Sequence, residues 1–207
     1  MNPAIETLIA KWAEPDGVPF KGELISDDGC MCAQGQALHY VGGWSPDRLR
    51  YVNQAVADRE TARLLNISVA HAVLLRRVND SQPGAPSVVL TDPARVLGDQ
   101  AETVLAFWRH LDRMTAEQWV VAGAAAGAAA RAAVWVAAGD DARAAAGYDA
   151  GYDAWAAARD AATAAAGYAT NEIQGARILR ERGQPFTFLP MFGFADPEAV
   201  LAAENDR

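Results

Sequence analysis

Cys30, Cys32 and His39 come closest to a reactive or metal-binding group, because thiolates and imidazoles are side chains that zinc prefers. Their pattern, C-x-C-x6-H, supplies three ligands, whereas a structural zinc site needs four and usually takes its cysteines from C-x2–4-C pairs. Residues two apart on a helix also point about 200° away from each other, so both thiols would not face one ion. We therefore predict that Cys30 and Cys32 are small core residues and that the chain binds no metal or other cofactor.

A thiol nucleophile would need a nearby base with an orienting group, and the sequence shows no such arrangement around the cysteines. No phosphate-binding loop is present, since the glycines of GAAAGAAA (123–130) lie within a helical pattern and lack a following Lys-Ser/Thr. Paired carboxylates such as Asp27 and Asp28 stand at predicted turns, where capping explains them. The sequence predicts that the protein is not an enzyme, with a thiol- or metal-dependent enzyme as the alternative.

An aromatic stripe is the strongest candidate for a binding surface. Four side chains at i, i+4, i+7 and i+11 form one continuous face of a predicted helix: Tyr148, Tyr152, Trp155 and Arg159. Three carboxylates lie beside this face: Asp149, Asp153 and Asp160. The stripe either packs against the rest of the protein or binds a partner, and these four residues are the predicted partner-binding residues.

A basic cluster near the end of the same region is the candidate for nucleic-acid contact. It consists of Arg177, Arg180 and Arg182. Arginine is also favoured at a helix C-terminus by the helix dipole, so the cluster has a structural explanation as well. The chain carries 26 Asp and Glu against 18 Lys and Arg, a net charge of −8 that repels phosphate backbones. The acidic balance therefore disfavours direct nucleic-acid binding.

The elements that position these residues are predicted to be mainly α-helical. Capping residues and apolar periodicity predict short helices in the first part of the chain. Two of these predicted helices cover residues 3–13 and 30–43. Further helices are predicted to begin after Ser45, Asp58 and Ser68, and the last one covers Gln100 to Met114. Residues 81–93 are predicted to form a loop, and GELIS (22–26) is either an extended stretch or a loop.

A long alanine-rich helical hairpin is predicted next. Residues 121–170 hold 26 of the 46 alanines, and residues 94–184 contain no proline. Thr115 is the predicted N-cap of a first arm that ends at Gly139, and a second arm could run to Arg182. Alanine gains little by membrane insertion, and Arg131 within the apolar run opposes it, so we predict no membrane span.

The last part of the chain has a different character. Six apolar residues are too apolar to remain exposed: Phe186, Phe188, Leu189, Met191, Phe192 and Phe194. Two prolines nearby, Pro185 and Pro190, oppose a helix, so we predict an extended clasp that packs back on the hairpin. Asp196-Pro197 then predicts the start of a last short helix. The expected division is an N-terminal helical domain (1–113), the alanine-rich hairpin (114–184) and the aromatic tail (185–207).

Three stretches resemble small proteins encoded by actinobacterial phages. Two are GCMCAQGQALHYVGG (29–43) and ISVAHAVLLRRVNDS (67–81). The third is the alanine-rich stretch that contains DAWAAARDAA (153–162) and closes on NEIQGA (171–176) and FLPMFGFADP (188–197), and it resembles a second common element of such genomes. Most of the chain is covered, but Met31 separates two cysteines that are adjacent in the usual Gly-x-Cys-Cys-x-Gly-type segment. The resemblance implies a phage or prophage origin and carries no catalytic residue onto this chain. The first ten residues lack the features of a secretory signal, so we expect the cytoplasm of a host bacterial cell.

These observations together predict a non-catalytic phage or prophage accessory protein that acts through protein contacts. The partner would be a host protein, a phage protein or a second copy of the chain, since alanine faces can associate closely. The main alternative is a regulator of DNA transactions, associated with a recombinase or a replication protein.

Overall fold

The computed structural model describes residues 2–81, 86–137 and 189–206. Over these residues the chain is mainly α-helical, as predicted. The chain divides into two compact units, Met1–Asp112 (unit 1) and Arg113–Arg207 (unit 2).

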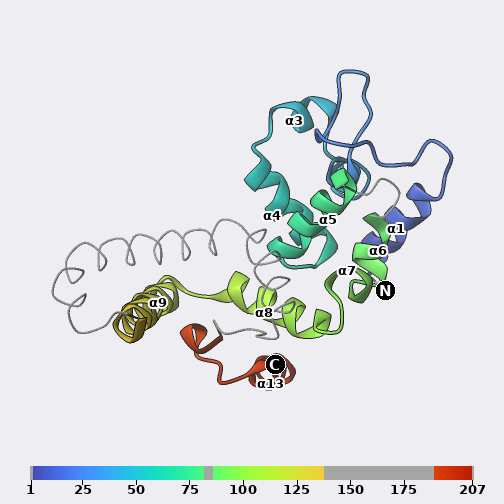
Figure 1. The fold of residues 1–207 in the computed structure, drawn as a ribbon. Helices are drawn as coiled ribbons and strands as arrows, with labels where there is room; N and C mark the ends of the chain where they lie inside the picture. The colour runs from blue at the N-terminus through green and yellow to red at the C-terminus, as the bar shows by residue number, and fades with distance from the viewer. Residues whose placement is uncertain (1, 82–85, 138–188, 207) are drawn as a thin grey trace. The chain divides into compact units, whose positions relative to one another are not determined.

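Unit 1 is built from short helices (Figure 1). They are α1 (Pro3–Trp12), α2 (Ala33–Gln36), the π-helical turn η1 (Ala37–Val41), α3 (Pro46–Tyr51), α4 (Gln54–Leu65), α5 (Val69–Ser81), α6 (Pro86–Thr91), α7 (Ala94–Leu97) and α8 (Ala101–Arg113). Helix α5 packs against α2, α4 and α6, and α1 packs against η1, α4 and α6. The segment between α1 and α2 contains one isolated antiparallel bridge, Ile25 to Met31.

The core of unit 1 follows from the apolar faces of these helices. One buried cluster joins the 24–31 segment to η1, α3 and α4: Ile25, Leu38, Trp44, Leu49 and Ala57. Helix α5 contributes Leu74 and Leu75, and α8 contributes Phe107 and Trp108, all of them buried. Each fully buried side chain of this size contributes about 1.5–3 kcal/mol relative to an exposed one, so these contacts hold the short helices together.

Several predicted helix starts are confirmed by their capping bonds. The Ser45 hydroxyl accepts a hydrogen bond from the Arg48 amide at 3.2 Å, and the Ser68 hydroxyl accepts one from the His71 amide at 3.1 Å. Such a side-chain acceptor satisfies one of the amides left free in the first turn.

Two predicted helix starts are wrong. The helix expected from Cys30 begins at Ala33, because Cys32 has extended backbone angles and is the N-cap. The helix expected to begin after Asp58 begins five residues earlier, at Gln54, because Asn53 is extended and its side chain accepts the Ala55 amide at 2.8 Å.

The loop predicted for residues 81–93 is also wrong in part. Residues 86–91 form α6, and Val89 and Leu90 in it are buried. Pro86 is the first residue of this helix, a position where proline is favoured because its missing N–H would have no partner there anyway. The proline was therefore a start signal, although the sequence around it resembles a loop.

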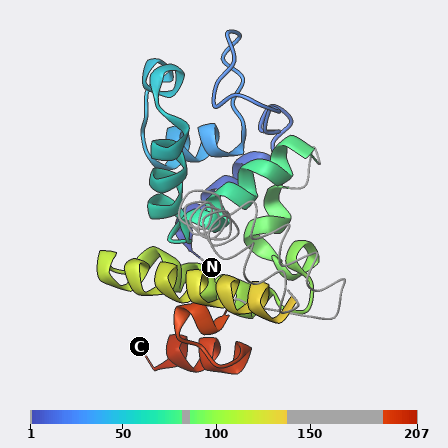
Figure 2. The same ribbon diagram turned by 60° about the vertical axis from the view of Figure 1, so that its left-hand side comes forward.

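Unit 2 contains α9 (Ala116–Ala137), the 3-10 turn η2 (Leu189–Phe192) and α13 (Pro197–Asn205) among its described residues (Figure 2). Thr115 caps α9 as predicted, since its hydroxyl accepts the Gln118 amide at 3.3 Å. Asp196 caps α13 as predicted, through the Ala199 amide at 2.8 Å.

The described part of the tail packs on α9 through η2. The rings of Trp119 and Phe192 meet edge to face with centroids 6.1 Å apart, and Leu189 is buried. The expectation of a wholly extended tail is wrong, because η2 contains Pro190. A proline near the start of a single 3-10 turn gives up no required hydrogen bond.

Within the part of the chain that the structure describes, no helix is both long enough and apolar enough to cross a membrane. The second arm predicted for the hairpin lies outside the described residues.

Candidate functional site

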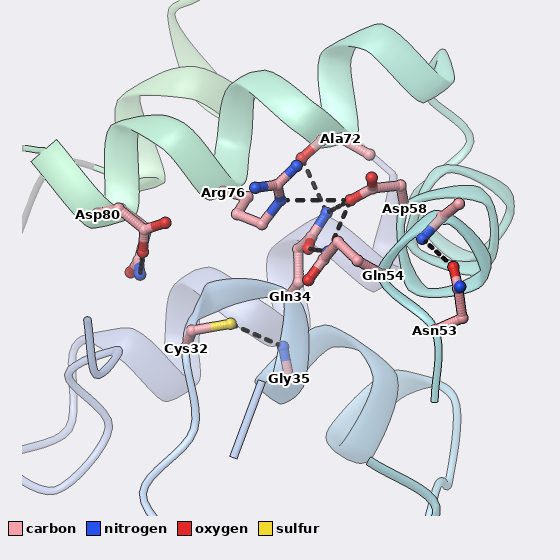
Figure 3. A network of polar contacts seen from close by, with 11 residues as sticks. Cys32, Gln34, Gly35, Asn53, Gln54, Asp58, Ala72, Arg76 and Asp80 are labelled. Carbon is pink, nitrogen blue, oxygen red and sulfur yellow. Dashed lines mark hydrogen bonds and ion pairs between the residues drawn. The ribbon is translucent and has the colours of Figure 1, made fainter. Parts of the chain in front are cut away.

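A cluster of polar side chains joins α2, α4 and α5 inside unit 1 (Figure 3). It consists of Gln34 from α2, Gln54 and Asp58 from α4, and Arg76 from α5, and we call it the Asp58 cluster. Gln34 is fully buried and Asp58 is buried. Polar groups in such surroundings destabilise a fold unless they are hydrogen-bonded, so their partners decide what the cluster can do.

Asp58 is the acceptor at the centre of the cluster. Its Oδ1 accepts hydrogen bonds from Gln34 Nε2 at 2.8 Å and from Gln54 Nε2 at 2.9 Å. Arg76 Nε lies 3.5 Å from the same oxygen. Gln54 Nε2 also donates to Gln34 Oε1 at 2.8 Å, and Gln34 Nε2 donates to the Ala72 carbonyl at 3.0 Å.

The contact between Arg76 and Asp58 is an ion pair without a hydrogen bond. Arg76 Nε is buried and makes no hydrogen bond to any described residue, while the side chain as a whole is 25% exposed. Two amides and one guanidinium thus surround Asp58 Oδ1. The two bonds that Gln34 makes to Gln54 and Ala72 connect residues 20 and 38 positions apart in sequence, so the cluster fixes the spacing of three helices.

The two cysteines have different surroundings. Cys32 is buried, and its Sγ accepts a hydrogen bond from the Gly35 amide at 3.4 Å. Burial raises the pKa of the Cys32 thiol, so it stays protonated and unreactive near neutral pH. Cys30 is exposed, which contradicts the prediction that both are core residues. Neither cysteine is in a disulfide.

Two of the three histidines contact backbone carbonyls. His39 Nδ1 lies 2.7 Å from the Trp44 carbonyl, and His71 Nε2 lies 2.7 Å from the Val89 carbonyl. A carbonyl only accepts, so in each case the ring nitrogen donates. Burial lowers the pKa of His71. Among the described residues, no three of the His, Cys, Asp and Glu side chains are grouped as metal ligands would be.

The predicted binding residues cannot be placed. Outside the described residues lie Tyr148, Tyr152, Trp155 and Arg159, together with Arg177, Arg180 and Arg182. They remain sequence-based predictions.

The Asp58 cluster was not predicted from the sequence, although two signals for it were present. Gln54 and Asp58 are four residues apart, which places both on one helix face. Arg76 shares its helix face with Ala72 and Val69, so a charged side chain stands on an otherwise apolar face. A charge at such a position points to a buried partner.

Large apolar side chains are exposed on both units. They are Val18 (60%), Phe20 (46%), Tyr40 (45%) and Tyr51 (88%) in unit 1, and Val120 (72%) and Val121 (67%) in unit 2. Single exposed apolar residues are common on protein surfaces, whereas grouped ones indicate a contact surface.

Comparison with known proteins gives no relative from which a site could be transferred. No protein-family model matches the chain, and neither a curated protein nor a solved structure matches it.

Proposed function

We propose that the protein is a non-catalytic accessory protein of a phage or prophage, and that it acts by binding another protein. One observation carries the proposal: Asp58, Cys32, His39 and His71 of unit 1 make contacts inside the fold, while large apolar side chains stand on the surface. The resemblance of three sequence stretches to small phage proteins supports the phage or prophage origin.

Four side chains of unit 1 that could take part in chemistry have structural roles. Asp58 accepts two amide donors, and the Cys32 thiol is buried at the start of α2. His39 and His71 each donate to a backbone carbonyl. A general base or nucleophile needs free access to a substrate, which these contacts oppose.

The surface, in contrast, carries features of a binding protein. Phe20, Tyr40 and Tyr51 expose large parts of their aromatic rings, and aromatic side chains are enriched at the centres of protein interfaces. The proposed partner-binding stripe, Tyr148, Tyr152, Trp155 and Arg159, would add further aromatic surface of the same kind.

Mass photometry combined with affinity purification from the bacterial host tests this proposal. We expect the tagged full-length chain to form either a defined homo-oligomer or a complex of fixed stoichiometry with one host or phage protein. Tyr152→Ala together with Trp155→Ala is expected to reduce the complex, with Tyr168→Ala as a matched control outside the stripe. A chain that remains monomeric and yields no complex of fixed stoichiometry would overturn the proposal.

A further inference from the structure

One side of helix α9 is apolar and exposed. Val120 is 72% exposed and Val121 67%, and Ala124 and Ala128 are exposed further along the same helix. Each residue of an α-helix turns the chain by about 100°, so these four positions fall within about 100° of one another around the axis. They form one continuous surface, which we call the Val120 face.

The other described parts of unit 2 pack on a different side of α9. Ala122 is 5% exposed, and the Trp119 ring meets the Phe192 ring of η2 edge to face. Trp119 and Ala122 stand about 180° around the helix from the middle of the Val120 face. Figure 2 shows η2 along one side of α9. Exposed apolar side chains grouped on the opposite side indicate a contact surface.

The two ends of this side of α9 carry opposite charges. Glu117 is exposed in the first turn of the helix. Arg131 stands fourteen residues later in the same helix, a separation that brings it back to within about 40° of the Glu117 position. No charged residue stands between them in the sequence. The Val120 face therefore lies between an acidic position and a basic position, about 21 Å apart along the axis.

Such a surface is complementary to itself when two copies pair in antiparallel orientation. Ala124 stands seven residues from Glu117 and seven from Arg131. A twofold axis at Ala124 consequently places Glu117 of each copy opposite Arg131 of the other, and Val120 of each copy opposite Ala128 of the other. Every contact across a twofold axis occurs twice, so the pair gains two ion pairs while it covers both apolar faces. The small Ala124 side chain lets the two backbones approach closely at the axis.

We propose that two copies of the chain pair through the Val120 face, antiparallel, about a twofold axis at Ala124. This inference rests on the proposed function and names a second copy as the partner. Charge complementarity selects that occupant and its direction, because a parallel pair would set Glu117 beside Glu117 and Arg131 beside Arg131. A nucleic acid or an anionic membrane is disfavoured, since residues 118–130 carry no positive charge.

Sedimentation velocity of the full-length chain measures the pairing. We expect a dimer that dissociates on dilution. Glu117→Arg and Arg131→Glu, each made alone, should raise the Kd of the dimer about tenfold or more, because like charges then lie opposite each other at both ends. The double reversal, Glu117→Arg with Arg131→Glu, restores opposite charges and should return the Kd to within about threefold of the wild type.

Glu198→Arg is the matched control for these reversals. Glu198 is exposed in the first turn of α13, as Glu117 is in the first turn of α9. Its reversal therefore opposes a helix dipole in the same way, but at a position outside the Val120 face. The Kd of the dimer should stay unchanged, and circular dichroism should show that all variants remain helical.

Disulfide cross-linking tests the position of the axis. The exposed thiol of Cys30 is first removed by Cys30→Ser. In that background Ala124→Cys should form a disulfide between the two copies, because both residues 124 meet at the axis. Val120→Cys should not, since the two residues 120 would lie about 12 Å apart along the helices, farther than the ~7 Å between Cα atoms that a disulfide can span.

Three outcomes would overturn the inference. They are a chain that stays monomeric at every concentration, single reversals that leave the Kd unchanged, and a double reversal that fails to restore pairing. These results are distinguishable from failure of the proposed function. If the chain is monomeric but captures one host or phage protein in fixed stoichiometry, the Val120 face is not a self-pairing surface and the proposed function stands. A dimer that resists both single reversals leads to the same conclusion, because it pairs through another surface.

Discussion

Asp58 is a buried carboxylate whose Oδ1 accepts hydrogen bonds from two glutamine amides and lies 3.5 Å from Arg76 Nε. We expect Asp58→Ala to lower the free energy of unfolding by about 3 kcal/mol, because it leaves two amide donors and a partly buried charge without their acceptor. Urea unfolding of the full-length chain, followed by circular dichroism, measures the change.

Glu60→Ala is the control for this substitution. Glu60 lies on the same helix and pairs with Arg63, whose side chain is 65% exposed, at 3.0 Å. Removing such a surface pair should change stability by less than about 1 kcal/mol. Equal changes in the free energy of unfolding for the two substitutions would show that the Asp58 cluster stabilises the fold no more than an exposed ion pair does.

His71 makes the stability of unit 1 depend on pH. Burial lowers its pKa in the folded chain, whereas in the unfolded chain the imidazole takes a proton below about pH 6.5. The stabilisation is complete above that pH. It is lost as the pH falls from about 6.5 toward the lowered pKa of the folded state, because protons then bind the unfolded chain preferentially.

His71→Gln should remove this part of the pH dependence. The glutamine amide can still donate toward the Val89 carbonyl, which His71 Nε2 reaches at 2.7 Å, but it does not titrate. Unfolding free energies of both proteins between about pH 7.5 and pH 5 give the comparison. If the unfolding free energies of the variant and the wild type change identically with pH, the pH dependence does not come from His71.

At the residue scale, the roles of the two cysteines and of Asp58 were predicted only in part, because burial and long-range partners decide them. Cys30 and Cys32 were both predicted to be core residues, and only Cys32 is buried. The burial of Cys32 and the exposure of Cys30 depend on where helix α2 begins, which the spacing does not reveal. Asp58 was interpreted as a cap because an aspartate near a helix start fits that role equally well; only the long-range partners Gln34 and Arg76 distinguish the two roles.

At the element scale, α9 depends on its N-terminal cap more than most helices do. Alanine side chains bury little apolar area, so local terms carry a larger share of the helix's stability. Thr115 and Gln118 form a reciprocal capping box: the Thr115 hydroxyl accepts the Gln118 amide at 3.3 Å, and Gln118 Oε1 accepts the Thr115 amide at 2.8 Å.

Thr115→Ala should destabilise the first turns of α9 by about 1 kcal/mol. Hydrogen–deuterium exchange of the peptides covering residues 116–125 should become faster, while exchange in α4 and α5 stays the same. Thr115→Ser keeps the hydroxyl and should preserve the protection. Faster exchange in the serine variant as well would show that the threonine methyl group, and not the cap, is responsible.

Helices were more predictable than their boundaries. Ser45, Ser68, Thr115 and Asp196 were identified from sequence because each combines a capping side chain with a following helical pattern. The start of α4 at Gln54 was missed because Asn53 follows α3 after a single residue, Val52. Two helices so close together give one continuous pattern in the sequence, and only the extended backbone between them separates the elements.

At the scale of the whole molecule, the two compact units suggest independent folding. We expect residues 1–112 to fold alone into a helical protein with cooperative thermal unfolding. The fragment should end at Asp112, because its Oδ2 accepts the Val69 amide at 2.8 Å at the start of α5. A fragment that ends at residue 111 should therefore melt at a lower temperature, and a fragment 1–112 without cooperative unfolding would contradict the prediction.

The mainly helical architecture followed from the absence of proline in residues 94–184 and from apolar periodicity, which are properties of the whole sequence. The long-range contacts did not follow from it. Gln36 Nε2 reaches the Gly17 carbonyl, 19 residues away, and a sequence pattern carries no information about such a contact.

The junction between α4 and α5 is completed by both ends of unit 1. The Leu65 carbonyl accepts a hydrogen bond from Asn2 Nδ2 at 2.7 Å, across 63 residues, and the Val69 amide donates to Asp112, across 43 residues. Contacts so distant in sequence form slowly, because a long loop must close before they are made. During synthesis on the ribosome, the junction therefore waits for the last residue of the unit to leave the exit tunnel.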